Sequence, residues 1–210
     1  MGTTADKLNK LIENVNTEAE LIAQIQDIVP FDDALINGNL TQYTNNRVTS
    51  IGRAFDYFSN LTTVSFPAAT TIGSYAFYYC TDLTTVSFPS ATTIENNAFQ
   101  YCSSLKTANF PVCTTIGDSA FQYCSNLTTA NFPKATTIGS NAFYCCSKLT
   151  SLYLTGSSVV TLGNSSAFYS TPMKTALSGK YGSIYVPASL LTSYKAATNW
   201  TYYSARIVGI

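Results

Sequence analysis

The sequence contains no histidine and few charged residues, and both shortages narrow what the protein can do. Histidine is the most common general base in enzymes and a frequent neutral metal ligand, so its absence from all 210 residues argues against both roles. Only 10% of the residues are charged, and 11 basic side chains balance 11 acidic ones. A chain without net charge has no bulk attraction for nucleic acid or anionic lipid. We therefore expect no nucleic-acid partner.

Long apolar runs and catalytic motifs are also missing. No run approaches the roughly 20 apolar residues of a membrane-spanning helix, and the opening MGTTADKLNKLIEN shows no signal peptide. There is no G-x-G-x-x-G motif, no P-loop and no basic stripe with interleaved aromatics. The repeated part holds acids at unrelated positions that form no carboxylate pair: Asp56, Asp82, Glu95 and Asp118. These absences predict a protein that is not an enzyme, needs no cofactor or metal and spans no membrane.

What the sequence does contain is one phrase that recurs with a period of about 22 residues, a length found in solenoid repeats. AFYYCTDLTTVSFPSATTIENN is followed by AFQYCSSLKTANFPVCTTIGDS and then by AFQYCSNLTTANFPKATTIGSN. One phenylalanine of each repeat lies at a constant interval from the next, except that the last interval is slightly longer: Phe55, Phe77, Phe99, Phe121, Phe143 and Phe168. In a solenoid each repeat forms one coil, and neighbouring coils share a core.

Each phrase predicts two extended stretches and one turn of helix. LTTVSF alternates apolar and polar side chains as a strand does, and the proline that follows ends the strand because it has no N–H group. A second short extended stretch, Thr70-Thr71-Ile72 in one copy, comes next. A single helical turn over residues 119–124 should then direct Phe121 and Cys124 toward the core.

The phrase resembles the bacterial surface leucine-rich repeats of the BspA type, whose signature runs AFxxCxxLxxVxFP and then xxTTIGxx. One copy of it consists of Ala76-Phe77, Cys80, Leu83, Val86, Phe88-Pro89 and Thr92-Thr93-Ile94, and the resemblance covers residues 48–162. It implies a leucine-rich-repeat solenoid of right-handed coils, with a parallel β-sheet on the concave face and short helical turns. It also implies a cell-surface or secreted protein with a role in adhesion or partner binding, and no catalytic residues.

Both ends of the chain depart from the repeat, and a solenoid needs covered ends because its terminal coils would otherwise expose core. In residues 1–36 apolar residues follow a heptad frame that a capping box, Thr17-x-x-Glu20, interrupts. This segment can therefore be either a helical cap on the first coil or an oligomerisation segment. Residues 37–169 form the predicted solenoid. Residues 170–210 predict a C-terminal strand–helix cap, with a strand at 184–187, a helix at 188–200, and Trp200 and Tyr203 packed inside.

Charge is unevenly distributed along the chain. Acids gather before the first coil: Asp6, Glu13, Glu18, Glu20, Asp27, Asp32 and Asp33. Basic residues gather in or near the last one: Lys174, Lys180, Lys195 and Arg206. In a solenoid sequence order becomes spatial order, so opposite ends carry opposite charge. Chance composition of the two end segments is the plain alternative that we favour; the other is weak head-to-tail self-association that salt would screen.

Four cysteines share one position of the repeat: Cys80, Cys102, Cys124 and Cys146. A disulfide ladder, a metal site and simple packing all fit such a column. The first coil has Phe58 there, while Cys113 and Cys145 replace the alanine and the tyrosine of sister coils. A position that accepts these exchanges needs a side chain that fills space in the core, not a particular ligand atom. The tight C-x-x-C spacing of metal sites is also absent. We favour six free thiols, with disulfides between adjacent coils as the alternative.

The polar positions of the strands predict a partner-binding surface. In leucine-rich strands the residues between the inward ones face the concave surface, and here nearly all are hydroxyls or amides. The candidates on this face are Thr62, Thr63, Thr84, Thr85, Lys106, Thr107, Asn109, Thr128, Asn131 and Tyr153. A solvated face in which threonine simply suits a strand is the plain alternative. Tyr78 and Tyr144, beside the predicted helical turn, are further contact candidates because their position varies between copies.

These features predict a non-catalytic binding or adhesion module of a bacterial cell-surface or secreted protein. Its polar concave face would contact a host or bacterial surface protein or a glycan. A structural or receptor-binding component of a prophage particle is the alternative. The expected location is extracellular or at the cell surface, and a virion in the alternative case.

Overall fold

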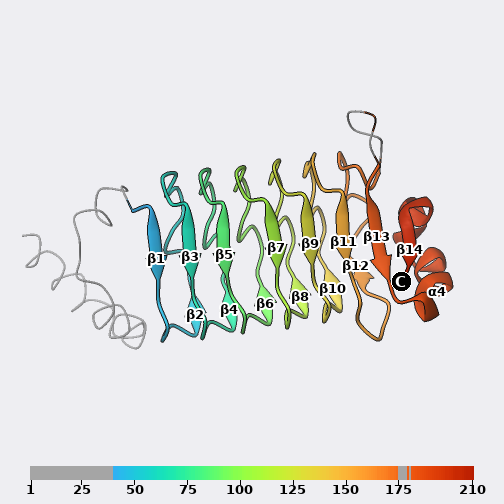
Figure 1. Cartoon of the computed structure of the whole chain (residues 1–210), viewed down its shortest axis with the longest axis horizontal. Helices are drawn as coiled ribbons and strands as arrows, with labels where there is room; N and C mark the ends of the chain where they lie inside the picture. The colour runs from blue at the N-terminus through green and yellow to red at the C-terminus, as the bar shows by residue number, and fades with distance from the viewer. Residues whose placement is uncertain (1–39, 175–178, 180) are drawn as a thin grey trace, which may run out of the picture.

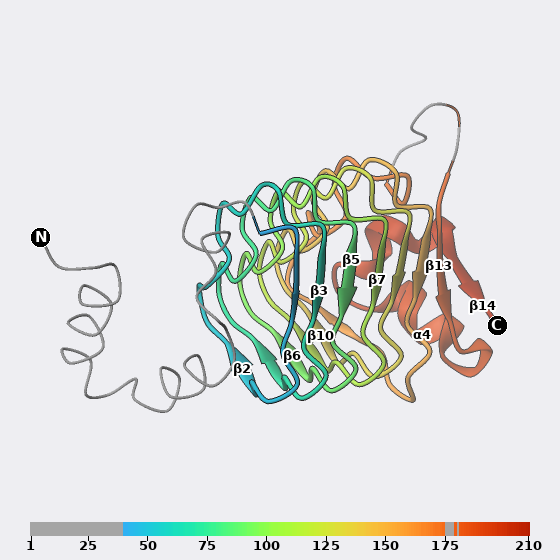
Figure 2. The same cartoon turned by 60° about the vertical axis from the view of Figure 1, so that its left-hand side comes forward.

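The computed structural model describes residues 40–174, 179 and 181–210. The helices and the acidic end predicted for residues 1–36 lie outside this part of the chain. The described chain winds into a stack of coils, seen side-on in Figure 1 and obliquely in Figure 2. Its strands pair in parallel with the equivalent strand of the next coil at all but one step of the stack. The parallel-strand solenoid predicted from the repeat is confirmed.

Each coil contributes one longer and one shorter strand, and the two kinds lie in separate rows (Figure 2). The longer strands are β1 (Gln42–Thr44), β3 (Thr63–Ser65), β5 (Thr85–Ser87), β7 (Thr107–Asn109), β9 (Thr129–Asn131), β11 (Ser151–Tyr153) and β13 (Ser183–Val186). The shorter strands are β2 (Ser50–Ile51), β4 (Thr71–Ile72), β6 (Thr93–Ile94), β8 (Thr115–Ile116), β10 (Thr137–Ile138) and β12 (Thr161–Leu162). We call the outward surface of the longer strands the strand face.

The core is a double column of buried phenylalanine rings. The first column stacks at centroid distances of 5.2–5.4 Å and consists of Phe55, Phe77, Phe99, Phe121, Phe143 and Phe168. The second stacks at 5.5–6.1 Å and consists of Phe66, Phe88, Phe110 and Phe132. These distances follow the spacing of paired strands, about 4.8 Å. The columns predicted to pack inside are therefore confirmed as core.

In most coils two Thr-Thr pairs form corners that bond one coil to the coil before it. The Thr62 carbonyl oxygen accepts hydrogen bonds from the N–H groups of Thr84 at 2.9 Å and Thr85 at 3.1 Å, and from the Thr84 hydroxyl at 3.1 Å. Thr92 repeats the arrangement at the second corner, where its hydroxyl donates to the Thr70 carbonyl oxygen at 3.1 Å. The hydroxyl of the first threonine in such a pair is therefore bonded to the backbone of the preceding coil and is not available as a donor to a partner.

The strand face is interrupted between β5 and β7. A three-stranded sheet ends at β5 and a five-stranded sheet begins at β7, whereas the shorter strands form one six-stranded sheet. Figure 1 shows the wider spacing between these two strands. Lys106 occupies the corner position that threonine holds in neighbouring coils, so the hydroxyl bond to the preceding coil is missing. Val86, on the open side of β5, is partly exposed, whereas its neighbour Val64 is fully buried.

Replacing Lys106 by threonine is expected to close this gap and to raise the free energy of unfolding by about 1 kcal/mol, because the new hydroxyl can donate to the Thr84 carbonyl oxygen. Urea unfolding followed by circular dichroism measures the change. Lys106→Ala removes the charge without adding a hydroxyl, and should leave stability within about 0.5 kcal/mol of the original. An equal gain in both variants would show that the hydroxyl is not the cause.

The segment between the shorter strand and the next coil is not helical, and this corrects the prediction of a helical turn. In residues 119–124, Ser119 and Tyr123 have positive φ angles of 55° and 62°, which an α-helix of L-residues does not contain. The Tyr123 N–H donates instead to the Tyr144 carbonyl oxygen of the next coil at 2.9 Å. Phe121 and Cys124 still face the core, as predicted. Hydrogen bonds between coils, along the solenoid axis, therefore determine the backbone conformation here, and the local preference for a helix does not.

Beyond Phe168 the chain leaves the repeat and packs over one end of the core (Figure 1). The predicted strand is β13, and β14 (Ile207–Gly209) pairs with it. Trp200 and Tyr203 are buried, as predicted, with ring centroids 6.0 and 5.3 Å from that of Phe168.

The helix predicted over residues 188–200 is broken into three elements: η1 (Ala188–Leu190), α4 (Leu191–Ala196) and η2 (Trp200–Arg206). It is interrupted because Ala197 takes extended backbone angles and Asn199 a left-handed φ of 64°. Among the described residues no helix is long and apolar enough to cross a membrane. The capping role of residues 170–210 and the domain limits stay predictions.

Candidate functional site

The structure divides the predicted strand-face residues into two groups. Thr62, Thr84 and Thr128 stand at corners, with hydroxyls that donate to backbone carbonyl oxygens of the preceding coil at 2.8–3.1 Å. The residues that project from the strands form two rows along the axis. One row is Thr63, Thr85, Thr107, Thr129, Ser151 and Ser183, and the other is Ser65, Ser87, Asn109, Asn131, Tyr153 and Tyr185. These rows, and the exposed Lys106 at its corner, present polar groups outward among the described residues.

The second row changes from hydroxyls to amides and then to phenols toward the C-terminal end. Asn131 Nδ2 donates to Asn109 Oδ1 at 2.8 Å. The rings of Tyr153 and Tyr185 stack with centroids 4.7 Å apart and an interplanar angle of 15°. These side chains pair mainly with each other, and Lys106 is the one cation predicted for this face. The strand face is therefore polar and nearly uncharged, and its amides and phenols pair with each other.

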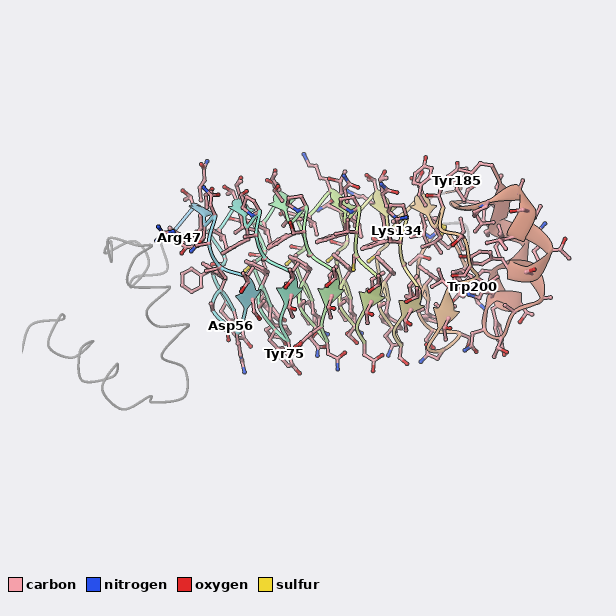
Figure 3. The ribbon with its side chains drawn as sticks, turned by 90° about the horizontal axis from the view of Figure 1, so that it is seen from below. Arg47, Asp56, Tyr75, Lys134, Tyr185 and Trp200 are labelled. Atoms are coloured by element: carbon pink, nitrogen blue, oxygen red, sulfur yellow. The ribbon has the colours of Figure 1, made fainter. Side chains whose placement is uncertain are left out.

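The other side of the solenoid bears a connected chain of tyrosine rings, which we call the tyrosine surface. Its members are Tyr57, Tyr75, Tyr78, Tyr79, Tyr101, Tyr123, Tyr144 and Tyr169. Contacting rings have centroids 4.4–5.9 Å apart. Figure 3 shows Tyr75 and Tyr185 at opposite edges of the solenoid. The strand face, mainly of hydroxyls and amides with two phenols at its C-terminal end, is thus distinct from the tyrosine surface.

Backbone geometry orders the main tyrosine column. Tyr57, Tyr79, Tyr101 and Tyr123 have left-handed φ angles of 61–65°, a region that bulky residues rarely adopt. The Tyr101 ring stacks on Tyr79 at 4.4 Å and on Tyr123 at 4.7 Å. Such pairs contribute about 0.5–1.5 kcal/mol each, which offsets the backbone strain. The column packs against itself at the surface, and Tyr57 remains 60% exposed.

Tyr78 joins this column to its N-terminal neighbours. Its ring contacts those of Tyr57, Tyr75, Tyr79 and Tyr101. Burial raises the pKa of the Tyr78 phenol, with the neighbouring phenols adding to the effect. The hydroxyl therefore stays neutral over a wide pH range and can both donate and accept a hydrogen bond.

The far end of the tyrosine surface is extended by Tyr144, the second residue predicted to make contact outside the strand face. Its ring contacts Tyr123 edge-on at 5.8 Å and stacks on Tyr169 at 5.6 Å. Sequence reasoning missed Tyr169, although it follows Phe168 as Tyr144 follows Phe143. It also missed Tyr75, whose position holds Asn97 in the next coil, so no periodic signal marks it.

The cysteines of the shared column point into the core. All six cysteines are free thiols in the structure. The Cys102 thiol donates to the Phe77 carbonyl oxygen at 3.1 Å, and the other members of the column make the same contact. Burial raises the pKa of Cys80 and of Cys113 to about 12. Protonated thiols are poor nucleophiles and poor ligands, and the described residues include no group of three His, Cys, Asp or Glu placed to hold a metal ion.

Two of the acids that the sequence left unassigned bond neighbouring coils. The Glu95 carboxylate accepts from the N–H and the hydroxyl of Ser74, both at 2.9 Å. Asp118 accepts from the Ser140 N–H at 2.6 Å. Each carboxylate is committed to a backbone donor of the adjoining coil, which is a structural role.

The coils are stacked, each contains one longer strand, and an inward-facing leucine precedes that strand. These features define a leucine-rich-repeat solenoid. The family model described as BspA type leucine rich repeat region matches residues 49–175 in six copies, and the chain therefore belongs to this family. No curated protein matches the sequence.

The comparison with solved structures finds the same fold in another bacterial protein, and two further structures are similar at lower TM-scores. The pneumococcal vaccine antigen PcpA is similar with a TM-score of 0.60 and 16% identity, over 81% of this chain and 41% of PcpA. A leucine rich repeat protein of T. pallidum gives a TM-score of 0.49 and 22% identity, over 62% of this chain and 76% of that one. A leucine rich cell surface protein of Faecalibacterium prausnitzii gives a TM-score of 0.44 and 23% identity, over 70% of this chain and 47% of that one. The chain thus spans less than half of PcpA and of the F. prausnitzii protein, and identities this low indicate fold alone.

Proposed function

We propose that this protein is a non-catalytic binding module on the outside of a bacterial cell, and that the tyrosine surface is its main contact with a protein partner. The observation behind the proposal is the connected chain of tyrosine rings, in which Tyr57 and Tyr169 are at least half exposed. Tyrosine is enriched at protein interfaces because it combines a broad apolar ring with a polar tip. The repeat does not require this chain, since Gln100 and Gln122 fill the position of Tyr78 in the middle coils.

The rings are also held in fixed positions before any partner arrives. Tyr57, Tyr79, Tyr101 and Tyr123 each pack against the ring of an adjoining coil, and their left-handed backbone limits where the side chain can point. A rigid aromatic surface loses little conformational entropy on binding. Near the N-terminal end Arg53 lies over the Tyr75 ring at 5.3 Å and forms an ion pair with Asp56 at 2.8 Å. Tyrosine and arginine are the residues that most often dominate binding energy, so this end is the expected hot spot.

The strand face is the second candidate, with a glycan as its partner. The outward amides of Asn109 and Asn131 and the stacked phenols of Tyr153 and Tyr185 favour it, because sugars are bound by amides and aromatic rings together. Family membership supports a location outside the cell for either surface. A part in a prophage particle is compatible with the same surfaces, and adjacent tail genes would favour it.

The test is to apply the purified protein to arrays of glycans and of purified secreted and surface proteins. A double variant, Tyr78→Ser with Tyr144→Ser, is expected to bind the selected protein at least about tenfold more weakly, as loss of hot-spot tyrosines does. The matched control, Thr85→Ala with Thr107→Ala, changes the strand face and should bind as the original does. Loss of binding in the control alone would refute the proposal, and a glycan bound in that pattern would establish the second candidate.

A further inference from the structure

A cavity of about 570 Å³ lies beside the corner that follows β9, near the C-terminal end of the solenoid. Residues 133–136 form one wall, residues 155–158 the second, and Pro187, Ser189 and Leu190 the third. Figure 3 labels Lys134 between the two rows of strands, away from Tyr75. The cavity is therefore separate from the tyrosine surface, and its function can be tested independently of the proposal above.

The cavity exists because the repeat is lengthened at this point. On the strand face Ser151 pairs with Thr129, at the same sequence interval as between Thr129 and Thr107 in the preceding pair. In the row of shorter strands Thr161 pairs with Thr137, and this interval is longer by two than the one between Thr137 and Thr115. The two additional residues therefore lie between β11 and β12, where the other coils turn a tight corner. They widen the loop that becomes the second wall.

The C-terminal segment fixes this loop from behind. The Val160 N–H donates to the Tyr194 hydroxyl oxygen at 3.1 Å, and Trp200 Nε1 donates to the Val160 carbonyl oxygen at 2.7 Å. Tyr194 and Trp200 are both fully buried. A wall held by buried hydrogen bonds is formed in advance, so a ligand need not order it.

The lining combines one cation with hydroxyls and apolar surface. Lys134 is exposed, and among the residues that the structure describes no hydrogen bond or ion pair holds its ammonium group. None of the described lining residues is acidic. The Ser157, Ser158 and Ser189 hydroxyls can donate and accept, while Pro187 and Leu190 offer apolar contact. The Thr136 hydroxyl already donates to the Thr114 carbonyl oxygen at 3.0 Å. The surrounding half of the chain reinforces the charge, because seven basic residues and one acid follow Phe99.

We propose that this cavity binds a carboxylate-bearing sugar residue, such as a uronic or sialic acid at the end of a glycan. The carboxylate would pair with the Lys134 ammonium in a charge-assisted hydrogen bond. Sugar hydroxyls would exchange hydrogen bonds with Ser157 and Ser158, and the C–H face of the ring would lie on Pro187. A neutral sugar would leave the ammonium unpaired, so the site discriminates by charge.

Titration of the ¹⁵N-labelled full chain with glucuronate, and with glucose as the neutral match, tests this. Trp200 is the single tryptophan, so its indole N–H gives one signal that reports on the wall through Val160. Glucuronate is expected to shift this signal and the amides of Ser157 and Ser158 saturably, with a Kd of about 1 mM for a ligand of this size. Glucose should bind about tenfold more weakly.

Lys134→Gln is expected to weaken glucuronate binding about tenfold and to remove its advantage over glucose. Lys148→Gln alters an exposed lysine outside the cavity and should leave the Kd unchanged. The absence of a saturable shift, or equal binding of glucose and glucuronate to the original protein, would overturn the proposal. Inorganic phosphate that reproduced the same shifts at the same concentrations would show a general anion site and overturn the sugar assignment.

Discussion

Replacing Phe121 by alanine is expected to lower the free energy of unfolding by about 3–5 kcal/mol. The ring is fully buried, with the rings of Phe99 and Phe143 at 5.2 and 5.3 Å in its own column. It also meets Phe110 and Phe132 of the second column at 6.0 and 5.9 Å. Coils on both sides are tied together by strands, corners and turns, so the structure cannot collapse into the space that the ring leaves.

Thr107→Ala is the matched control for this prediction. Thr107 projects outward from β7 and is exposed, so its loss should change stability by no more than about 0.5 kcal/mol. Urea unfolding of both variants under the same conditions gives the comparison. Similar losses in the two would mean that the inward and outward positions of the repeat have been assigned wrongly.

Raising the pH above 9 is expected to destabilise the protein steeply. Burial raises the pKa of Cys80 and of Cys113 from the ordinary 9.0 to about 12, and it raises those of Cys102, Cys124 and Cys146 as well. In the unfolded chain a thiol loses its proton near pH 9, whereas the folded chain keeps it. The stability due to the neutral thiol is therefore complete below pH 9 and is lost between about pH 9 and pH 12. Within that window each such thiol lowers the free energy of unfolding by about 1.4 kcal/mol per pH unit.

Cys113→Ala isolates one of these thiols, because Ala69, Ala91 and Ala135 fill the same position in other coils. Urea unfolding at pH 8, 9 and 10 should show a shallower alkaline fall for the variant than for the original, by about 1.4 kcal/mol in total between pH 8 and pH 10, most of it above pH 9. Parallel curves would contradict the role given to the buried thiol.

Alkylation of unfolded, unreduced protein should add one group to each of the six cysteines, and fewer adducts would reveal a disulfide.

Strictly periodic positions were predictable from the sequence because stacking places the same residue in the same environment in every coil. Phe99, Cys102 and Leu105 recur with their counterparts at the fixed interval of the repeat and are all fully buried. The role of Thr84 was not predictable, because a β-branched hydroxyl suits a strand facing solvent as well as a corner bonded to a carbonyl. The left-handed turn at Tyr79 was missed for a similar reason, since local preferences disfavour tyrosine there and only the bonds between coils impose it.

Features that break the period were the least predictable parts of the candidate sites. Tyr75 completes the tyrosine surface but has no aromatic counterpart in the next coil. The cavity beside Lys134 depends on two added residues whose placement the interval from Phe143 to Phe168 does not specify. Binding surfaces arise where coils differ from one another, and a repeat describes only what the coils share.

Hydroxyl-radical footprinting of the protein, alone and bound to the protein selected on the arrays, tests the central claim most directly. Tyrosines on the two outward surfaces have the same intrinsic reactivity, so each surface serves as the control for the other. Protection of Tyr57, Tyr75 and Tyr123, with Tyr153 and Tyr185 modified as in the free protein, is the predicted result. Protection of Tyr153 and Tyr185 with an unchanged tyrosine surface would contradict the account and identify the strand face as the contact.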